Sequence, residues 1–261
     1  MSKFFKLLKH VQLHKASMVI GLSGWGNAGE ASTLSVSYLI DKLKAEKIGE
    51  IPSVRFYVYQ IQRPLVAIKA GLVQDYRPLR NDLFCWKDQN EGADLVFLLG
   101  AEPHLNWVIY AQAVLNVAES LKIRRIYTLG GYLADPSLTG ASFVTGSSNN
   151  REIIAELKSV GVELVDYKGP TSVYSEILWS GKAKNVDVVS LWCAVPFYGE
   201  GPNPEASYDL LSKLMAMLDL KLELTDLKKK ADSFAARISA EVGGEMRRLT
   251  DDFEKRPSFL I

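Results

Sequence analysis

The sequence predicts an α/β protein in which one layered domain, built on a mixed sheet, is followed by C-terminal helices. Three observations indicate this class. Strand-like apolar runs alternate with helix-like periodicity up to about residue 220, a glycine-rich turn joins the first strand to the first helix, and an apolar stripe of helical spacing follows residue 225. We therefore expect an α/β domain over residues 1–220 and a helical extension over residues 221–261.

The predicted elements of the first part alternate between strand and helix. Continuous apolar runs predict buried strands, and apolar positions spaced by three to four residues predict helices. Strands are expected at 19–22, 53–61, 93–100, 124–131 and 185–196, and helices at 29–43, 104–121, 150–159, 172–181 and from Pro204 onward. Gly181 is expected to cap the C-terminus of the helix that it ends.

Three further segments complete the prediction. Residues 63–76 predict a hairpin that turns at Ala70-Gly71, so the sheet is expected to be mixed. Residues 132–150 are rich in turn formers and are expected to hold a functional loop. The tail carries one apolar stripe with a phase change at Gly243-Gly244, which predicts a kink there; its positions are Leu227, Ala231, Phe234, Ile238, Val242, Met246, Leu249 and Phe253.

Composition excludes several classes of protein. The 261 residues carry a net charge of +1, so no general attraction to nucleic acid or to an anionic membrane is expected. No segment has the length of a secretory signal or of a membrane-spanning helix, so we expect a cytoplasmic protein without membrane insertion. Cys85 and Cys193 lie in apolar runs and are expected to be buried thiols.

The stretch from Gly24 to Gly29 reads G-x-G-x-x-G between a strand and a helix, as in a dinucleotide fingerprint. A dinucleotide site also needs an acidic residue at the end of the second strand, and that place is not filled. Trp25 between the first two glycines would crowd a pyrophosphate. A glycine-permitted packing turn is therefore the preferred interpretation, although the helix N-terminus that follows still favours a small anion.

Two other segments carry polar groups that suit a ligand. Glu102 follows a predicted central strand, where it is either an acid or ligand contact, or a cap of the helix that starts near Pro103. Ser147 and Asn149 either hydrogen-bond a substrate or cap the helix after them. Three histidines without metal-ligand spacing predict no metal site, and the sequence leaves the cofactor unknown.

Several motifs in order resemble the proteasome assembly chaperone 2 family. They are GLSGWGNAGEAS, LLGAEPHLNW, YKGPTS and VPFYGEGPNPEAS, with Asn27 and Ser172 where the family has Asp and Gly. The resemblance covers most of the chain and implies a three-layer αβα sandwich similar to the phosphorylase/hydrolase-like fold, C-terminal helices and a homo-oligomer, for which a trimer is the family-level expectation. Prokaryotic members sometimes carry the name carboxylate-amine ligase.

Two functions remain open at this point. The first is an oligomeric assembly or ligand-sensing scaffold that has room for a protein partner, with the tail stripe either packed on its own domain or, as we expect, on a neighbouring subunit. The alternative is an enzyme that acts on a small nucleoside- or carboxylate-type ligand, for example by ATP-dependent carboxylate–amine ligation. Its expected ligand-binding residues are Gly24, Trp25, Gly26, Asn27, Glu30, Glu102, Ser147 and Asn149.

Overall fold

A computed structural model describes residues 4–89, 92–135, 143–196 and 201–254, with side chains described up to residue 240 except at 54 and 239. Its main sheet has nine strands in the order β1-β3-β6-β7-β2-β8-β11-β9-β10. The strands are β1 Lys6–Leu7, β2 Ser17–Ser23, β3 Glu46–Ile51, β6 Asn81–Trp86, β7 Leu95–Ala101, β8 Arg125–Ala134, β9 Val144–Ser148, β10 Glu163–Leu164 and β11 Asp187–Pro196. The four central strands β7, β2, β8 and β11 are parallel. Because β6 and β9 flank them in the antiparallel sense, the predicted mixed sheet is confirmed.

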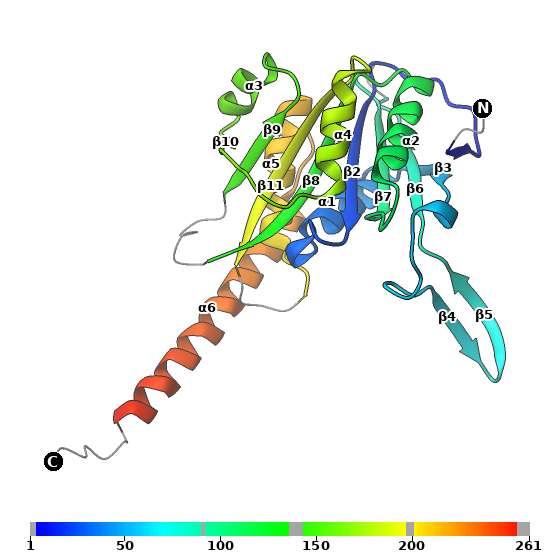
Figure 1. Cartoon of the computed structure of the whole chain (residues 1–261). Coiled ribbons are helices and arrows are strands. Elements are labelled where there is room, and N and C mark those ends of the chain that lie inside the picture. The colour runs from blue at the N-terminus through cyan, green and yellow to red at the C-terminus, as the bar shows by residue number, and fades with distance from the viewer. Residues whose placement is uncertain (1–3, 90–91, 136–142, 197–200, 255–261) are drawn as a thin grey trace.

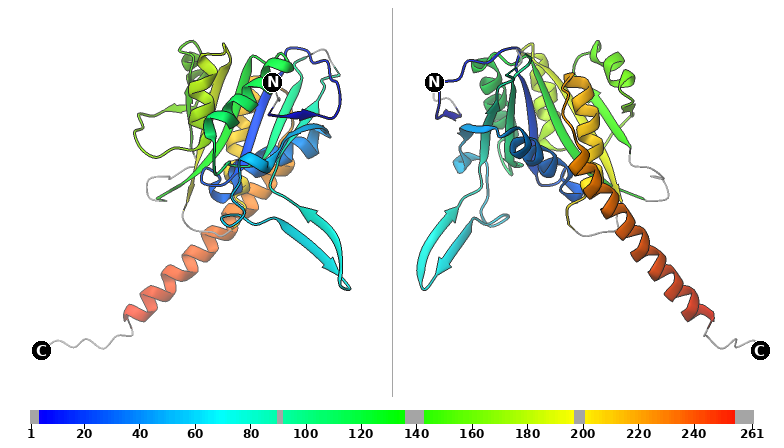
Figure 2. Two further views of the ribbon diagram at one scale, coloured as in Figure 1. Left: turned by 45° about the vertical axis from the view of Figure 1, so that its right-hand side comes forward. Right: turned by 180° about the vertical axis from the view of Figure 1, so that it is seen from behind.

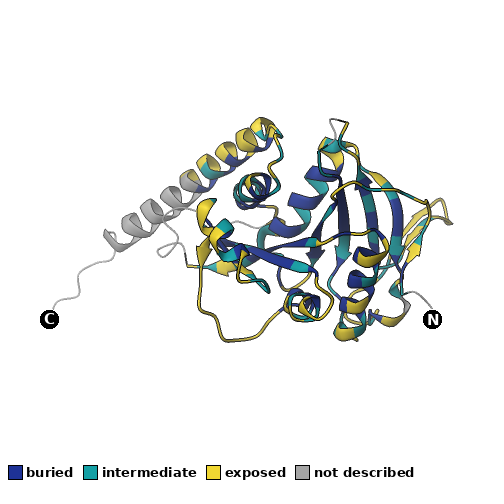
Figure 3. Ribbon diagram, turned by 90° about the horizontal axis from the view of Figure 1, so that it is seen from above, coloured by how far each residue is buried: buried dark blue, intermediate teal, exposed yellow. Residues whose placement is uncertain are grey.

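Helices cover both faces of this sheet (Figure 1, Figure 3). They are α1 Ala31–Leu43, α2 Trp107–Ser120, α3 Ile153–Ser159, α4 Val173–Lys182, α5 Pro204–Leu218 and α6 Thr225–Glu254, with short 3-10 turns η1 Ala28–Glu30 and η2 Ser53–Arg55. Alternate residues of β2 face opposite layers: Met18 and Ile20 pack in a core with α2 and α4, and Val19 packs in a core with α1 and α5. The architecture is an α/β sandwich.

The hairpin was predicted correctly and lies outside the main sheet. Strands β4 Leu65–Lys69 and β5 Leu72–Arg77 pair only with each other, and they turn at Ala70 (φ 50°) and Gly71 (φ 79°). Two positive φ angles in a two-residue loop match the right-handed twist of the strands that it joins.

The strand expected at 53–61 is wrong. Pro52 follows β3, and the chain then forms η2 and a series of turns. Phe56 and Tyr57 are buried there, whereas Tyr59 is exposed. The Phe56 carbonyl accepts hydrogen bonds from the backbone N–H groups of His104 and Leu105, which hold this segment against the start of α2. Strands β1, β3, β6, β9 and β10 were not predicted. Strand β9 occupies part of the expected functional loop, of which residues 136–142 lie outside the described part.

Two glycine predictions also fail. Gly181 lies inside α4, where an added Cβ would lie 2.7 Å from Val188 Cγ2, so this glycine permits close helix–strand packing and is not a cap. Helix α6 runs through Gly243-Gly244 without a break. The second half of the tail stripe, from Val242 on, lies outside the described side chains.

The first half of α6 packs on the body of the same chain. Leu227, Ala231, Phe234 and Ile238 are buried, and α6 lies against α5 (Figure 2). Beyond them the helix extends away from the sandwich. In the part of the chain that the structure describes, no helix has the length and apolar character needed to cross a membrane.

Candidate functional site

The strongest candidate site lies where β2 and β7 end and α4 begins. We call it the carboxyl-edge cluster; it consists of Gly24–Asn27, Glu102, Ser172–Tyr174 and Trp192. Ligands of open α/β sheets bind at this edge because loops from neighbouring parallel strands meet there.

Glu102 connects the loop after β2 to the N-terminus of α4. Its Oε2 accepts a hydrogen bond of 3.2 Å from the backbone N–H of Trp25, and its Oε1 accepts one of 2.8 Å from the N–H of Val173. A carboxylate at this position also faces the positive end of the helix dipole. Glu102 does not cap the helix after Pro103, because α2 starts at Trp107 with Asn106 at its N-cap position. It contacts α4 instead, where Ser172 is the N-cap and Glu102 accepts the N–H of the first helical residue, Val173.

The three glycines of the G-x-G-x-x-G stretch each have a packing role. Gly24 has φ +127°, and a Cβ there would lie 2.9 Å from Glu102 Cβ. A Cβ on Gly26 would lie 2.8 Å from the indole of Trp192, and one on Gly29, which has φ +55°, would lie 2.8 Å from Asn203 Cβ. These contacts support the interpretation of the stretch as a packing turn.

The side chain of Asn27 closes the same turn. Its Oδ1 accepts a hydrogen bond of 3.1 Å from the N–H of Thr33 in the first turn of α1, and its Nδ2 donates one of 3.0 Å to Thr33 Oγ1. Asn27 thus acts as a cap of α1, a role that an oxygen-bearing side chain serves well. Glu30 is exposed at the N-terminus of α1 in a left-handed conformation (φ 53°).

A buried hydroxyl pair replaces a sheet hydrogen bond beside this turn. Pairing of β2 with β8 ends at Gly21, and the next N–H, of Leu22, donates to Tyr174 Oη at 2.8 Å and to Ser32 Oγ at 3.1 Å. The two hydroxyls are 3.0 Å apart. Burial raises the pKa of Tyr174, so this phenol stays protonated.

Two tryptophans belong to the cluster. The Trp192 ring packs edge-on against Tyr174 at 5.9 Å and against Trp25 at 6.5 Å, while its Nε1 donates to Ser190 Oγ at 2.8 Å. Trp25 itself is 61% exposed. An exposed aromatic ring that packs on the partly buried ring of Trp192 offers a flat apolar contact to another molecule.

Ser147 and Asn149 do not join this cluster. Ser147 lies in β9 opposite Ser190 of β11, and Asn149 lies at the amino end of β11. The Asn149 amide donates to the Val186 carbonyl at 3.0 Å and accepts from the Val188 N–H at 2.9 Å. These contacts lie toward the amino-terminal end of β11, whereas Glu102 follows the carboxyl end of β7. The structure therefore separates the predicted site residues into two groups.

The chemistry available at the carboxyl edge is limited by these contacts. Both carboxylate oxygens of Glu102 already accept hydrogen bonds from the backbone, and the Asn27 amide is paired with Thr33. His104 Nδ1 accepts a hydrogen bond of 3.0 Å from the Val58 N–H. Among the described residues no group of three or more His, Cys, Asp or Glu side chains is arranged to hold a metal ion. The cluster is therefore suited to holding loops together and to presenting Trp25.

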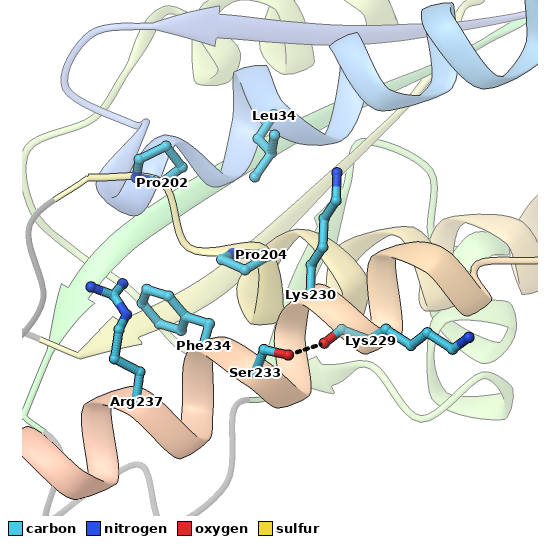
Figure 4. A pocket seen from close by; sticks show the side chains of 8 residues that line it. All are labelled: Leu34, Pro202, Pro204, Lys229, Lys230, Ser233, Phe234 and Arg237. Carbon is cyan, nitrogen blue, oxygen red and sulfur yellow. Dashed lines mark hydrogen bonds between the residues drawn. The ribbon is translucent and has the colours of Figure 1, made fainter.

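A hollow that is separate from the carboxyl-edge cluster lies between α1, the loop before α5, and α6 (Figure 4). Its volume is about 630 Å³. Apolar side chains and prolines lie beside the cations of α6; the lining residues are Leu34, Pro202, Pro204, Lys229, Lys230, Ser233, Phe234 and Arg237. No acidic side chain lines it in the described part of the chain. The sequence had not indicated this hollow, because it depends on where α6 crosses α1.

The model of the PAC2 family matches residues 21–242. The chain belongs to the PAC2 family. The resemblance found in the sequence motifs is thereby confirmed. The comparison with curated proteins gave no match.

Solved structures of family members have the same fold. A PAC2 family protein from Streptomyces avermitilis is 27% identical with a TM-score of 0.79, over 86% of this chain and 95% of that one. A proteasome-assembly chaperone homologue from Mycobacterium tuberculosis is also 27% identical with a TM-score of 0.79, over 86% and 94%. An archaeal proteasome activator from Pyrococcus furiosus, 22% identical, has a TM-score of 0.73 over 92% and 98%, which is a likeness of fold.

Proposed function

We propose that this PAC2 family member is an oligomeric assembly scaffold that acts by binding protein chains. The observation that carries the proposal is the state of Glu102, whose two oxygens cap α4 and tie down the Trp25 loop. An acid in that role stabilises the fold, because each of its oxygens accepts a hydrogen bond from a backbone N–H of the same chain. The named relatives supply the partner to test first, since one is a proteasome-assembly chaperone homologue and another a proteasome activator.

The enzyme alternative has less support from the residues. Ligation of a carboxylate to an amine with ATP requires a phosphate cradle, and the glycines of the expected cradle face Glu102, Trp192 and Asn203. A phosphorylase-like sheet and a small-ligand sensor at Trp25 remain compatible with the proposal, as does a cytoplasmic location. They are secondary to the protein-binding role.

Two measurements on the purified chain test the proposal. Native mass spectrometry of the chain mixed with proteasome α-type subunits from the same source is expected to show a complex that contains both. A thermal-shift screen with nucleotides, nucleosides and carboxylates is expected to show no stabilisation, because a ligand that binds only the folded state would raise its melting temperature. Stabilisation by one of these ligands, together with no protein complex, would contradict the scaffold.

A further inference from the structure

The hollow between α1 and α6, which we call the α6 hollow, has an apolar side and a charged side (Figure 4). Its apolar side consists of Leu34 from α1, Pro202 and Pro204 from the segment before and at the start of α5, and the buried ring of Phe234. Proline has no backbone N–H, so the two prolines present ring carbons and no donor. Among the described lining residues, all side-chain hydrogen-bond donors therefore come from α6.

The charged side of the α6 hollow is positive. Its three cations are Lys229, Lys230 and Arg237. Neither lysine forms an ion pair within the described part of the chain, and the acid that follows them on the helix, Asp232, pairs with Lys228 at 2.7 Å. The whole chain has a net charge of only +1, so positive charge is concentrated at this hollow. An anionic group that enters it is attracted and meets no acidic side chain among the described lining residues.

The cations lie on both sides of an apolar centre. Lys230, Phe234 and Arg237 are spaced by four and three residues, so they share one face of α6. Two helical turns, about 10 Å along the axis, separate Lys230 from Arg237. The Phe234 ring lies between them, with the Arg237 guanidinium 5.3 Å from its centre (Figure 4). A fitting occupant carries an anion on each side of an apolar group.

An extended peptide has this arrangement of groups. Alternate side chains of an extended chain point the same way, and residues four apart lie about 13 Å from each other. A segment that reads acid–any–apolar–any–acid can set its apolar side chain on Phe234 and the prolines while its carboxylates reach Lys230 and Arg237, whose long stems take up the difference in length.

Other anionic molecules fit the α6 hollow less well. A lipid anion carries its charge at one end only, whereas the cations of the hollow lie on both sides of Phe234. A nucleic acid strand needs exposed aromatic faces on which its bases stack, and Phe234 is only 8% exposed. The distribution of charge and apolar surface therefore favours a peptide.

We propose that the α6 hollow binds an extended segment of a partner protein that carries acidic side chains on both sides of an apolar one. The proposal rests on the protein-binding role given above and adds a binding surface separate from Trp25. Bonds from ammonium and guanidinium groups to carboxylates are charge-assisted, and at an exposed site they are screened by salt. Binding therefore weakens as the salt concentration rises.

Fluorescence anisotropy of a labelled probe peptide tests the chemistry of the occupant. The probe is fluorescein-labelled Gly-Glu-Gly-Phe-Gly-Glu-Gly, titrated with the full-length protein. One comparison peptide has Gln in place of both Glu residues, and another has Gly in place of Phe. Each is expected to bind about tenfold more weakly than the probe, because it loses either the charge-assisted bonds or the apolar contact.

Two lysines of α6 provide a matched pair of variants. Lys230 lines the hollow and Lys228 does not, and residues two apart on a helix do not face each other. Lys230→Gln and Lys228→Gln each remove one positive charge, so they reduce general attraction to an anion equally. We expect probe binding to weaken about fivefold in Lys230→Gln and less than about twofold in Lys228→Gln. Both side chains are exposed, so the melting temperatures are expected to stay close to that of the wild type.

Several outcomes would overturn the proposal. Absence of probe binding to the wild type would do so, as would equal affinities of the probe for Lys230→Gln and Lys228→Gln. Two competitors identify a different occupant: vesicles of phosphatidylglycerol and phosphatidylcholine, and a single strand of thymidylate. Displacement of the probe by either at a lower concentration of phosphate groups than that of unlabelled peptide would assign the hollow to a lipid or to a nucleic acid.

The complex with proteasome α-type subunits separates this proposal from the proposed function. A wild type that forms that complex but does not bind the probe overturns the peptide site alone. A wild type that does neither overturns both. Formation of the complex by Lys228→Gln but not by Lys230→Gln would show that the α6 hollow serves the protein-binding role.

Discussion

Replacement of Glu102 by alanine tests the central contact of the carboxyl edge. In the wild type the carboxylate satisfies two backbone N–H groups, those of Trp25 and Val173, at 3.2 and 2.8 Å. The variant leaves both donors without this acceptor. It also removes a negative charge from the N-terminus of α4.

The size of the effect follows from these two bonds. A hydrogen bond to a charged group contributes about 1.5–3 kcal/mol, and a helix-dipole contact about 0.3–1 kcal/mol. Glu102 is half-buried and the Trp25 bond is exposed, so we take the lower end of the range and count one strong bond and one weak bond. We expect Glu102→Ala to lower the free energy of unfolding by about 2–3 kcal/mol, which is about 4–10 °C in melting temperature.

Denaturation by urea and by heat measures this loss, with Glu30→Gln as the control. Glu30 is an exposed acid at a helix N-terminus, and its replacement is expected to change stability by less than about 0.5 kcal/mol. Glu102→Gln is expected to be intermediate, because one oxygen remains and the new amide NH₂ faces another donor. A Glu102→Ala protein as stable as the wild type would refute the capping role, and loss of ligand binding in such a protein would restore the enzyme interpretation.

Three further predictions concern other elements. Gly130→Ala places a Cβ 2.5 Å from the Trp192 ring, so it is expected to destabilise by about 1–3 kcal/mol and to shift tryptophan fluorescence, whereas unchanged melting and emission would contradict that contact. A hydrogen bond from Lys42 lowers the pKa of Asp226 from 3.8 to about 2. The stabilisation from Asp226 is therefore present above pH 4 and lost as the pH falls through 2. Since this side chain is 51% exposed, Asp226→Asn should cost at most about 1 kcal/mol at pH 7, and a cost that does not decrease as the pH is lowered from 4 towards 2 would rule out this linkage. A chain that ends after residue 241 keeps the buried half of α6 and should melt like the wild type; an unchanged mass in light scattering would exclude residues 242–261 as a contact between subunits.

The sequence predicted the parallel core of the fold well because its strands are covered on both sides. Runs such as 95–99 are continuously apolar, and the first two core strands, β2 and β7, are each followed by a helix of clear period, so strand and helix differ sharply. The strands outside the parallel core were missed for the opposite reason. The β3 sequence EKIGEI mixes charged residues with buried ones. The place of β3 in the sheet depends on its pairing with β6.

The candidate site was predicted only in part, because its contacts join residues far apart in the chain. Glu102 and the glycine turn were identified, each from its place after a strand. Their partners Val173, Tyr174 and Trp192 lie at least 71 residues from Glu102, and no local pattern marks them. Ser147 and Asn149 were selected as polar residues near a helix start, and the direction of β9 then placed them at the other edge.

The position of Trp192 explains why the glycines of the G-x-G-x-x-G stretch are needed for packing. In a cradle, the glycines leave room for a ligand beside the backbone. Here the space beside Gly26 and Gly130 is taken by one indole of β11, whose ring would lie 2.8 and 2.5 Å from their added Cβ atoms. The backbone N–H of Trp25, which a phosphate would otherwise approach, is held by Glu102. The space beside the glycines and the Trp25 N–H are therefore occupied by the chain's own side chains, those of Trp192 and Glu102. The exposed ring of Trp25 remains accessible to a partner.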